Sequence, residues 1–268
     1  MPQLSGAHAV ITGGSSGIGL ATAHAFVRRG ATVSLMARGS ERLEAAAAQL
    51  RQEGATVATA AVDVSDADAV RAAVKEVTAA QGPCDVLVAS AGQARPGRFL
   101  ELDDAIFRDM VEVDYFGVYQ AIRAVVPSMV ERRRGSIVAI SSAAALVGIY
   151  GYSAYGPAKF AVRGLMESLR GELKPHGVHV GCVFPPDVDT PQLVEENQWK
   201  PAETAAISGT IKPIHPDRVA LAIARGIERN KFAVYPDAGT AAIARLIPLA
   251  GSLWRRFEDS RIRSVTRK

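Results

Sequence analysis

Short apolar runs alternate along the chain with longer segments in which apolar residues recur at helical spacing. A loop with glycine or serine follows each run, and the runs cover residues 7–12, 32–37, 56–62, 85–90, 135–141 and 178–184. Continuous apolar strands that alternate with helices are typical of a parallel sheet covered on both faces. The pattern therefore predicts a single α/β domain built on a doubly wound parallel sheet.

The segments between the runs predict the helices. We expect helices over 41–53 and 66–80, a longer helix over 105–131 that is interrupted near Pro127, and a helix from Tyr152 towards Lys174. Residues 185–216 contain six prolines and little periodicity. This segment is predicted to be a long irregular loop over the mouth of the sheet, and loops of that length are commonly functional.

The composition excludes a disordered or fibrous chain, because 48% of the 268 residues are hydrophobic and 22% are charged. Cys84 and Cys182 lie far apart, and none of the five histidines has the spacing of a zinc ligand. We therefore expect neither a disulfide framework nor a metal site. No signal-peptide pattern precedes the first apolar run, so a cytoplasmic location is expected.

Positive charge is concentrated in a tail, residues 238–268, that follows a predicted domain of residues 1–237. Seven basic and two acidic residues follow position 240, whereas the whole chain has a formal net charge of +4. Since no basic face runs through the rest of the chain, no nucleic-acid partner is expected. The tail predicts an amphipathic helix, too short and too interrupted to span a bilayer, which lies either in a membrane interface or against a partner subunit. Its apolar positions are Ile243, Leu246, Ile247, Ala250, Leu253, Trp254 and Phe257.

A glycine-rich turn follows the first predicted strand and opens the first helix, where residues 12–19 read Thr-Gly-Gly-Ser-Ser-Gly-Ile-Gly. Glycine lets the backbone approach a pyrophosphate, which meets free N–H groups and the positive end of the helix dipole. The turn therefore predicts a dinucleotide site in a Rossmann-type fold. Its residues are Gly13, Ser15, Ser16, Gly17, Ile18 and Gly19.

The end of the second strand indicates which dinucleotide binds. An acidic residue there would accept hydrogen bonds from a ribose 2′-OH, but the sequence has Arg38, with Arg42 one helical turn later. We therefore expect NADPH, and the alternative is that both arginines are solvated surface charges. Four further residues complete the predicted cofactor pocket after the third and fourth strands: Asp63, Val64, Ala91 and Gly92.

A second group of polar residues suits proton transfer. Tyr155 and Lys159 are four residues apart on a predicted helix and so share a face, and Ser142 ends the fifth strand. A nearby ammonium and an oxidised nicotinamide both favour the phenolate of a tyrosine, so Tyr155 can act as acid or base. Ser142 can hydrogen-bond a substrate carbonyl.

Together these motifs resemble the short-chain dehydrogenase/reductase family over about residues 5–236, including the sequence Pro-Pro-Asp-Val-Asp-Thr at 185–190. The resemblance implies that Tyr155 donates the proton and that Lys159 binds ribose hydroxyls and lowers the pKa of Tyr155. It implies that Ser142 positions the carbonyl, with Ser141 as the alternative. It also implies that Val188 and Thr190 contact the nicotinamide carboxamide and phosphate side.

Two positions depart from the pattern of that family. Asp114 stands where asparagine usually supports a water chain to the active-site lysine, and an ionised carboxylate accepts but cannot donate. We expect Asp114 to keep this relay role, and the alternative is a surface aspartate. Ser90 stands where an asparagine commonly braces the sheet.

Within the family, residues 184–201 are most similar to the 3-ketodihydrosphingosine (3-ketosphinganine) reductases, through Pro-Pro-Asp-Val-Asp-Thr-Pro, Glu-Glu-Asn and Lys-Pro. The resemblance implies NADPH-dependent reduction of 3-ketosphinganine, a long-chain 2-amino-3-ketone, to sphinganine in sphingolipid biosynthesis. Two alternatives stay open. One is a reductase or dehydrogenase for another apolar ketone, sterol or retinoid, and the other is a nonenzymatic NADPH-binding regulator.

The loop over the site carries both charge and apolar surface. Leu193, Val194 and Trp199 stand beside acidic residues that either complement a cationic amine or face water. The family resemblance also implies a homodimer or homotetramer that assembles through the long fourth and fifth helices. The four acids of the loop are Asp187, Asp189, Glu195 and Glu196.

Overall fold

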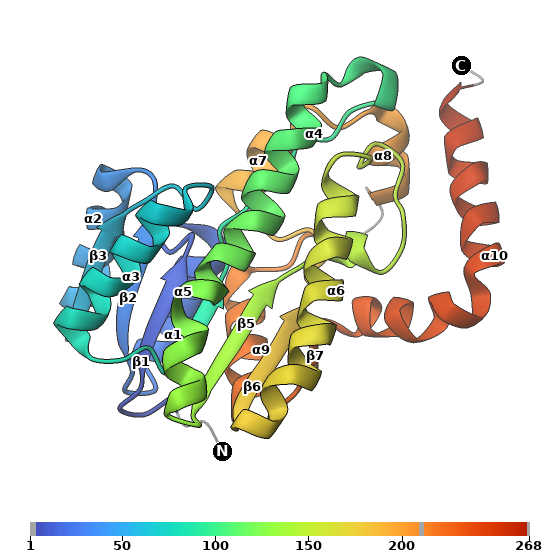
Figure 1. Ribbon diagram of the computed structural model, residues 1–268. Helices are drawn as coiled ribbons and strands as arrows, with labels where there is room; N and C mark the ends of the chain where they lie inside the picture. Colours follow the sequence, from blue (N-terminus) through green and yellow to red (C-terminus); the bar gives the residue numbers. More distant parts are fainter. Residues whose placement is uncertain (1–3, 209–211, 267–268) are drawn as a thin grey trace.

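The structure is a computed structural model that describes residues 4–208 and 212–266. Within these residues, parallel strands form one seven-stranded sheet in the order β3-β2-β1-β4-β5-β6-β7 (Figure 1). The predicted parallel sheet is confirmed, and only the two-residue β7 was not expected, because so short a strand leaves no pattern. The strands are β1 (His8–Thr12), β2 (Thr32–Ala37), β3 (Val57–Ala61), β4 (Val86–Ala89), β5 (Gly135–Ile140), β6 (Val178–Val183) and β7 (Ala233–Val234).

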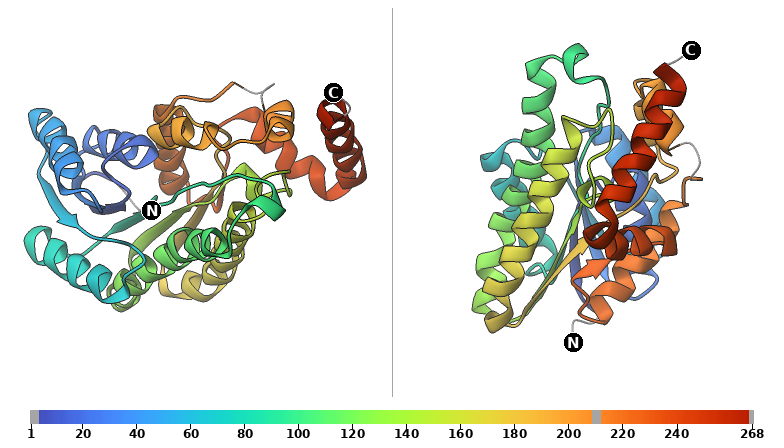
Figure 2. Two further views of the ribbon diagram at one scale, coloured as in Figure 1. Left: turned by 90° about the horizontal axis from the view of Figure 1, so that it is seen from above. Right: turned by 90° about the vertical axis from the view of Figure 1, so that its right-hand side faces the viewer.

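Helices cover both faces of the sheet, as the apolar strands require (Figure 2). One face packs against α1 (Gly17–Val27), α2 (Ser40–Gln52) and α9 (Pro216–Glu228). The other packs against α3 (Ala67–Gln81), α5 (Gly117–Glu131) and α6 (Tyr155–Leu173).

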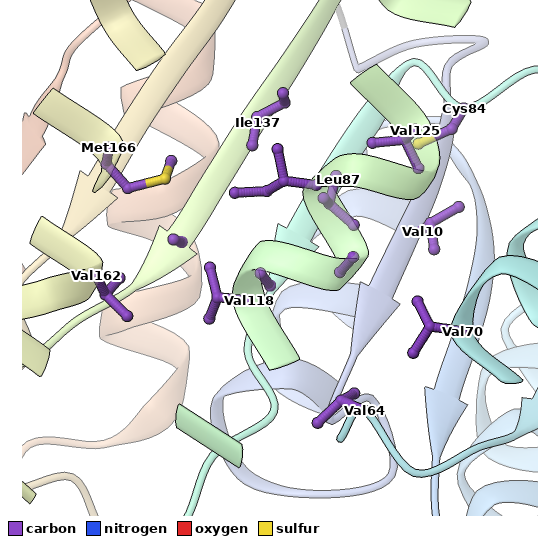
Figure 3. Close-up of a cluster of buried hydrophobic side chains, with 14 of the residues drawn as sticks. Val10, Val64, Val70, Cys84, Leu87, Val118, Val125, Ile137, Val162 and Met166 are labelled. Carbon is purple, nitrogen blue, oxygen red and sulfur yellow. The ribbon is translucent and has the colours of Figure 1, made fainter. Parts of the chain in front are cut away.

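Alternate residues of each central strand supply the two halves of the core. Val10, Leu87 and Ile137 point towards α5 and α6, where they join Val125 and Met166 in one buried cluster (Figure 3). Their chain neighbours point to the opposite face and form a second cluster, because successive side chains of a strand alternate between faces. The strand ends that carry the candidate site are therefore held rigidly from both sides.

The long helix predicted over 105–131 is interrupted, but not at Pro127. It consists of α4 (Asp104–Val111), a π-helical turn η2 (Glu112–Phe116) and α5, and Pro127 lies inside α5. The widened turn brings Asp114 into the protein interior, where its side chain is fully buried. Single π-turns inside helices are frequent at functional sites.

The prediction of a wholly irregular loop over 185–216 was wrong. The segment contains α7 (Pro191–Asn197) and α8 (Ala202–Ser208), while residues 209–211 lie outside the described part. Proline fits the first position of a helix, and Thr190 caps α7 by accepting a hydrogen bond from the Leu193 N–H at 3.3 Å. Pro191 and Pro216 therefore begin α7 and α9, and Pro201 directly precedes α8, so half of these prolines mark helix starts and not irregular chain.

The tail forms α10 (Ala238–Thr266), which bends at Ala250, where the backbone is non-helical (φ −122°, ψ 23°). Its second half rises beside α8 at the edge of the molecule (Figures 1 and 2). The bend distributes the apolar residues predicted for one face of the tail over two helical halves that run in different directions. Among the described residues, no helix is both long enough and apolar enough to cross a bilayer.

Candidate active site

A cavity of about 460 Å³ opens at the carboxyl ends of the strands, where the strand order reverses between β1 and β4. Ligands of open parallel sheets bind at this kind of position. Every residue predicted for the site lines the cavity except Asp114, which lies behind the wall. The sheet therefore brings together residues that are far apart in the sequence.

The glycine turn at the end of β1 is shaped for close backbone approach. Gly13 has a positive φ of 67°, and a side chain there would come within 2.8 Å of the Ala91 nitrogen. A side chain at Gly19 would come within 2.3 Å of the Gly13 oxygen. Ser16 begins α1 without a side-chain cap, so the first N–H groups of the helix remain free for an anion. These features fit the pyrophosphate of a dinucleotide.

The adjacent strand ends carry the charges predicted for the adenosine side. Arg38 and Arg42 are exposed and line the cavity, with Asp63 on the same wall. Partial burial acts to raise the pKa of the Asp63 carboxyl, but hydrogen bonds from Ser65 and the nearby Arg38 outweigh it and lower that pKa. The result is an ionised acid on the adenosine wall and two cations beyond β2.

Thr12 provides the brace expected from an asparagine at position 90. Its hydroxyl oxygen accepts hydrogen bonds from the Ser90 and Ala91 N–H groups, each at 3.1 Å. This joins the end of β1 to the loop after β4. The departure at Ser90 therefore leaves the two loops connected.

A buried ion pair lies beneath the cavity. Lys159 Nζ is 3.0 Å from Asp114 Oδ1 and donates to the Ile140 carbonyl at 3.3 Å. The Gln93 N–H donates to the same Asp114 oxygen at 3.1 Å. The two side chains are only 5% and 0% exposed. A side chain at Gly92 would lie 2.6 Å from Asp114 Oδ1, so glycine is needed beside the pair.

The environment of Asp114 is electrostatically unbalanced. Burial raises the pKa of its carboxyl, although Lys159 and the Gln93 N–H act to lower it. Its second oxygen, Oδ2, is buried and makes no hydrogen bond in the described structure. Asp114 is therefore no surface aspartate, and it has a free acceptor next to the lysine of the site.

Tyr155 lies in the cavity wall close to this pair. Lys159 Nζ is 5.5 Å from the centre of the tyrosine ring. Burial raises the pKa of Tyr155, the negative charge of Asp114 adds to the rise, and a hydrogen bond with Ser142 opposes it. This direction is opposite to the lowering that the family resemblance implies, because burial of the phenol and the charge of Asp114 outweigh the hydrogen bond with Ser142.

The two candidate serines have different partners. Ser141 is buried and donates its hydroxyl to the Lys159 carbonyl at 2.9 Å, which ties β5 to α6. Ser142 caps the short turn η3 (Ala143–Ala145) by accepting from the Ala144 N–H at 3.1 Å. The hydrogen bond between Ser142 and Tyr155 places the two hydroxyls side by side, where a carbonyl oxygen can meet both.

A polar network that spacing does not reveal lies next to Tyr155 at the cavity. Tyr152 donates its hydroxyl to Glu196, which is buried. Lys200 Nζ lies 3.1 Å from Glu196 and 3.0 Å from Asp187. Glu196 stood among the loop acids of the sequence, but Tyr152 carried no signal except its position one helical turn before Tyr155.

The cavity also reaches an apolar region formed by distant segments. Leu193 on α7, Ile207 on α8, and Ile243 and Trp254 on α10 line it. A helical tail at the cavity wall could not be expected from the sequence, because only the bend at Ala250 brings both of its halves to the site. The cavity thus has a charged dinucleotide end and an apolar end, with Tyr155 between them.

The chain matches a known family and proteins of known structure. The sequence profile described as short chain dehydrogenase matches residues 7–201. A solved structure of an actinorhodin polyketide ketoreductase variant with NADPH superposes with a TM-score of 0.80. The two chains are 29% identical, and the match covers 90% of this chain and 99% of the ketoreductase.

Two curated relatives are more similar in sequence. A 3-dehydrosphinganine reductase of Danio rerio is 40% identical over 235 residues, which cover 86% of this chain and 71% of the relative. A 3-ketodihydrosphingosine reductase of Dictyostelium discoideum is 36% identical over 283 residues, which cover 99% of this chain and 85% of the relative. Both similarities extend well beyond the glycine turn and the tyrosine helix.

Proposed function

The chain belongs to the short-chain dehydrogenase family, and from this premise we propose that it reduces 3-ketosphinganine to sphinganine with NADPH, a step of sphingolipid biosynthesis. The observation that carries the proposal is the meeting of Tyr155, Ser142 and the glycine turn in one cavity. The similarity to two reductases named for this substrate supports the choice of ketone. The apolar end of the cavity suits a long alkyl chain.

NADPH is proposed as the cofactor because no acid follows β2. Arg38 and Arg42 are placed where a 2′-phosphate would lie, and an arginine fork binds phosphate oxygens in pairs. The related ketoreductase structure with NADPH supports this choice. The proposed contacts to the rest of the cofactor are those predicted from the sequence, including Lys159 for the ribose and Val188 and Thr190 for the nicotinamide side.

Bound NADPH supplies the hydride for the ketone carbon, and the protein supplies the proton. We assign Tyr155 as the acid that gives its hydroxyl proton to the ketone oxygen. Ser142 donates a hydrogen bond to that oxygen and orients the carbonyl. Ser141 is unsuited to this role because its hydroxyl is already committed to the Lys159 carbonyl.

The raised pKa of Tyr155 keeps the phenol in the protonated form that reduction consumes, and it also makes that phenol a weaker acid. A phenol that stays protonated at neutral pH is ready to act as an acid, whereas oxidation needs the phenolate. We propose that Asp114 then helps return a proton to Tyr155 through Lys159 and water. Its unpaired Oδ2 offers the acceptor that such a relay needs.

We propose that α10, the tail beyond residue 237, rests on a membrane surface. Leu253 and Phe257 are one helical turn apart and are 63% and 43% exposed, and Leu246 is 59% exposed. Arg255 and Arg256 are exposed beside them and can meet anionic headgroups. Because Trp254 on the same helix lines the cavity, a lipid substrate could pass from the membrane to the site.

We also propose a homo-oligomer, a dimer or a tetramer, in the cytoplasm. Three large apolar side chains on neighbouring helical segments are partly exposed: Phe116 in η2 (37%), Tyr119 on α5 (38%) and Phe160 on α6 (41%). The segment α4–η2–α5 corresponds to the fourth predicted helix and α6 to the fifth, and the family resemblance implies assembly through these two. The two cysteines are free and buried, which agrees with a reducing compartment.

The proposed activity predicts rapid oxidation of NADPH when 3-ketosphinganine is added to the purified protein, and slower oxidation of NADH. Tyr155→Phe removes the acid and should lower kcat by about 10²- to 10⁴-fold. Absorbance of the reduced cofactor measures both effects. Faster turnover of a sterol or retinoid ketone would favour the alternative substrates, and binding of NADPH without oxidation would favour a regulator.

The Asp114 relay predicts a change in the pH profile as well as in rate. Asp114→Ala should lower kcat at least about tenfold, within the range of positioned proton transfer. Removing the negative charge of Asp114 lowers the pKa of Tyr155. Since reduction needs the protonated phenol, the loss of rate with rising pH should begin at a lower pH in Asp114→Ala than in the wild type.

Asp114→Asn is the matched control, because the amide keeps the size and one acceptor oxygen. It should retain most of the turnover but show the same shift of the pH profile, because it removes the same negative charge. Initial rates of the wild type and the two Asp114 variants, measured over a pH series with saturating NADPH, test the relay. An unchanged rate at every pH for Asp114→Ala would eliminate the relay.

The membrane proposal predicts that the double variant Leu253→Glu, Phe257→Glu binds vesicles of phosphatidylcholine and phosphatidylserine at least about tenfold more weakly, since a buried Leu or Phe contributes about 1.5–3 kcal/mol. Leu100→Glu is the control, because Leu100 is 94% exposed but lies far from α10 in the sequence. Cosedimentation measures binding. Equal binding by all three proteins would leave a partner subunit as the occupant of this face.

A further inference from the structure

The four acidic residues of the loop over the site separate into two pairs. Asp187 and Glu196 line the cavity, whereas Asp189 and Glu195 are exposed and do not line it. From the sequence alone, all four are equal candidates for the partner of a cationic amine. The structure therefore selects two carboxylates that a bound molecule can reach.

These two carboxylates share one cation. Lys200 is within 3.1 Å of both and its side chain is only 7% exposed. Tyr152 holds Glu196 from the other side by donating its hydroxyl. Burial raises the pKa of the Glu196 carboxyl, whereas the Tyr152 hydroxyl and Lys200 act to lower it. With Glu196 ionised, two carboxylates and one ammonium leave this part of the wall with one negative charge in excess.

Other cations near this wall are already engaged. Arg98 pairs with Glu101 and Glu203, and Arg95 stacks 3.1 Å from the centre of the Trp199 ring. In the part of the chain that the structure describes, Lys200 is the one cation within 4.0 Å of Asp187 or Glu196. The excess charge is thus available to a ligand.

The position of this charge suits a group next to the reacting carbonyl. The ring centres of Tyr152 and Tyr155 are 5.7 Å apart, and Tyr152 donates its hydroxyl to Glu196. A single tyrosine side chain therefore separates Glu196 from the proposed acid. In a 2-amino-3-ketone the nitrogen is two bonds from the carbonyl carbon, about 2.5 Å with ordinary bond lengths and angles. An amine held at Glu196 would therefore leave the ketone within reach of Tyr155.

We propose that Glu196, positioned by Tyr152 and Lys200 and assisted by Asp187, binds the protonated amine of the substrate and makes the site selective for 2-amino ketones. The inference rests on the proposed function and names the residues that give it specificity. An ammonium ion balances the excess charge and gains charge-assisted hydrogen bonds in a partly buried setting. A ketone without the amine leaves the carboxylates as they are.

The same contact couples substrate binding to the acid. The charges of Glu196 and Asp187 contribute to the raised pKa of Tyr155. A cation bound between them opposes that effect and eases the departure of the phenolic proton. The amine thus both orients the ketone and favours transfer of the proton to it.

The test compares two substrates in three proteins. The substrates are 3-ketosphinganine and a long-chain 3-ketone of equal length without the amine, and the proteins are the wild type, Glu196→Gln and Glu195→Gln. Glu195 is the matched control because it has the same side chain, lies next in the chain and is exposed. NADPH oxidation gives kcat/KM for each pair, and thermal unfolding verifies that each variant is folded.

We expect Glu196→Gln to lower kcat/KM for the amino ketone by about 10- to 100-fold, the range for losing one hydrogen bond to a charged group. The ketone without the amine should show no such loss, because it makes no contact with Glu196 and the removed charge only lowers the pKa of Tyr155. Both substrates should change by no more than about twofold with Glu195→Gln. If Glu196→Gln does not fold, Asp187→Asn should give a smaller loss in the same direction.

Each contrary outcome has a distinct meaning. An equal loss for both substrates, or no loss for either, overturns the assignment of Glu196 while 3-ketosphinganine remains the substrate. Equal kcat/KM of the wild type for the two ketones also overturns it. Failure of the wild type to reduce 3-ketosphinganine overturns the proposed function, and the assignment with it.

Discussion

The buried ion pair between Lys159 and Asp114 is the contact on which the rest of the site depends. It joins α6 to the π-helical turn, and the Ile140 carbonyl and the Gln93 N–H tie it to the ends of β5 and β4. Neither charge can stay in this interior alone, because an unpaired buried charge is strongly destabilising. The pair therefore fixes Lys159 close to the ring of Tyr155 and sets the electrostatic environment of the proposed acid.

The cavity has two ends with different physical requirements. Free N–H groups and two arginines suit the phosphates of a dinucleotide, whereas the other end combines apolar residues of α7, α8 and α10 with a network of net negative charge. Tyr155 lies where they meet. This arrangement matches the proposed ligands, an anionic dinucleotide at one end and a cationic lipid at the other.

Much of this arrangement could be predicted from the sequence. The strands were recognisable because both of their faces are buried, and the glycine turn, Tyr155 and Lys159 because local spacing fixes their geometry. The interruption at 112–116 was missed because Pro127 suggested a stronger break, although a helix tolerates it there. The contact of Tyr152 with Glu196 was missed for another reason: it joins residues 44 positions apart, and the fold of the loop alone decides it. The same is true of Trp254, which a bend in α10 brings to the cavity.

The central claim is that Lys159 and Asp114 are energetically one unit. A double-mutant cycle in urea unfolding tests it, with Asp114→Ala, Lys159→Ala and the two combined. Each single change should cost about 3–5 kcal/mol of unfolding free energy, and the double change should cost at least about 2 kcal/mol less than their sum. Costs that simply add would show that the two charges are independent and would contradict the account.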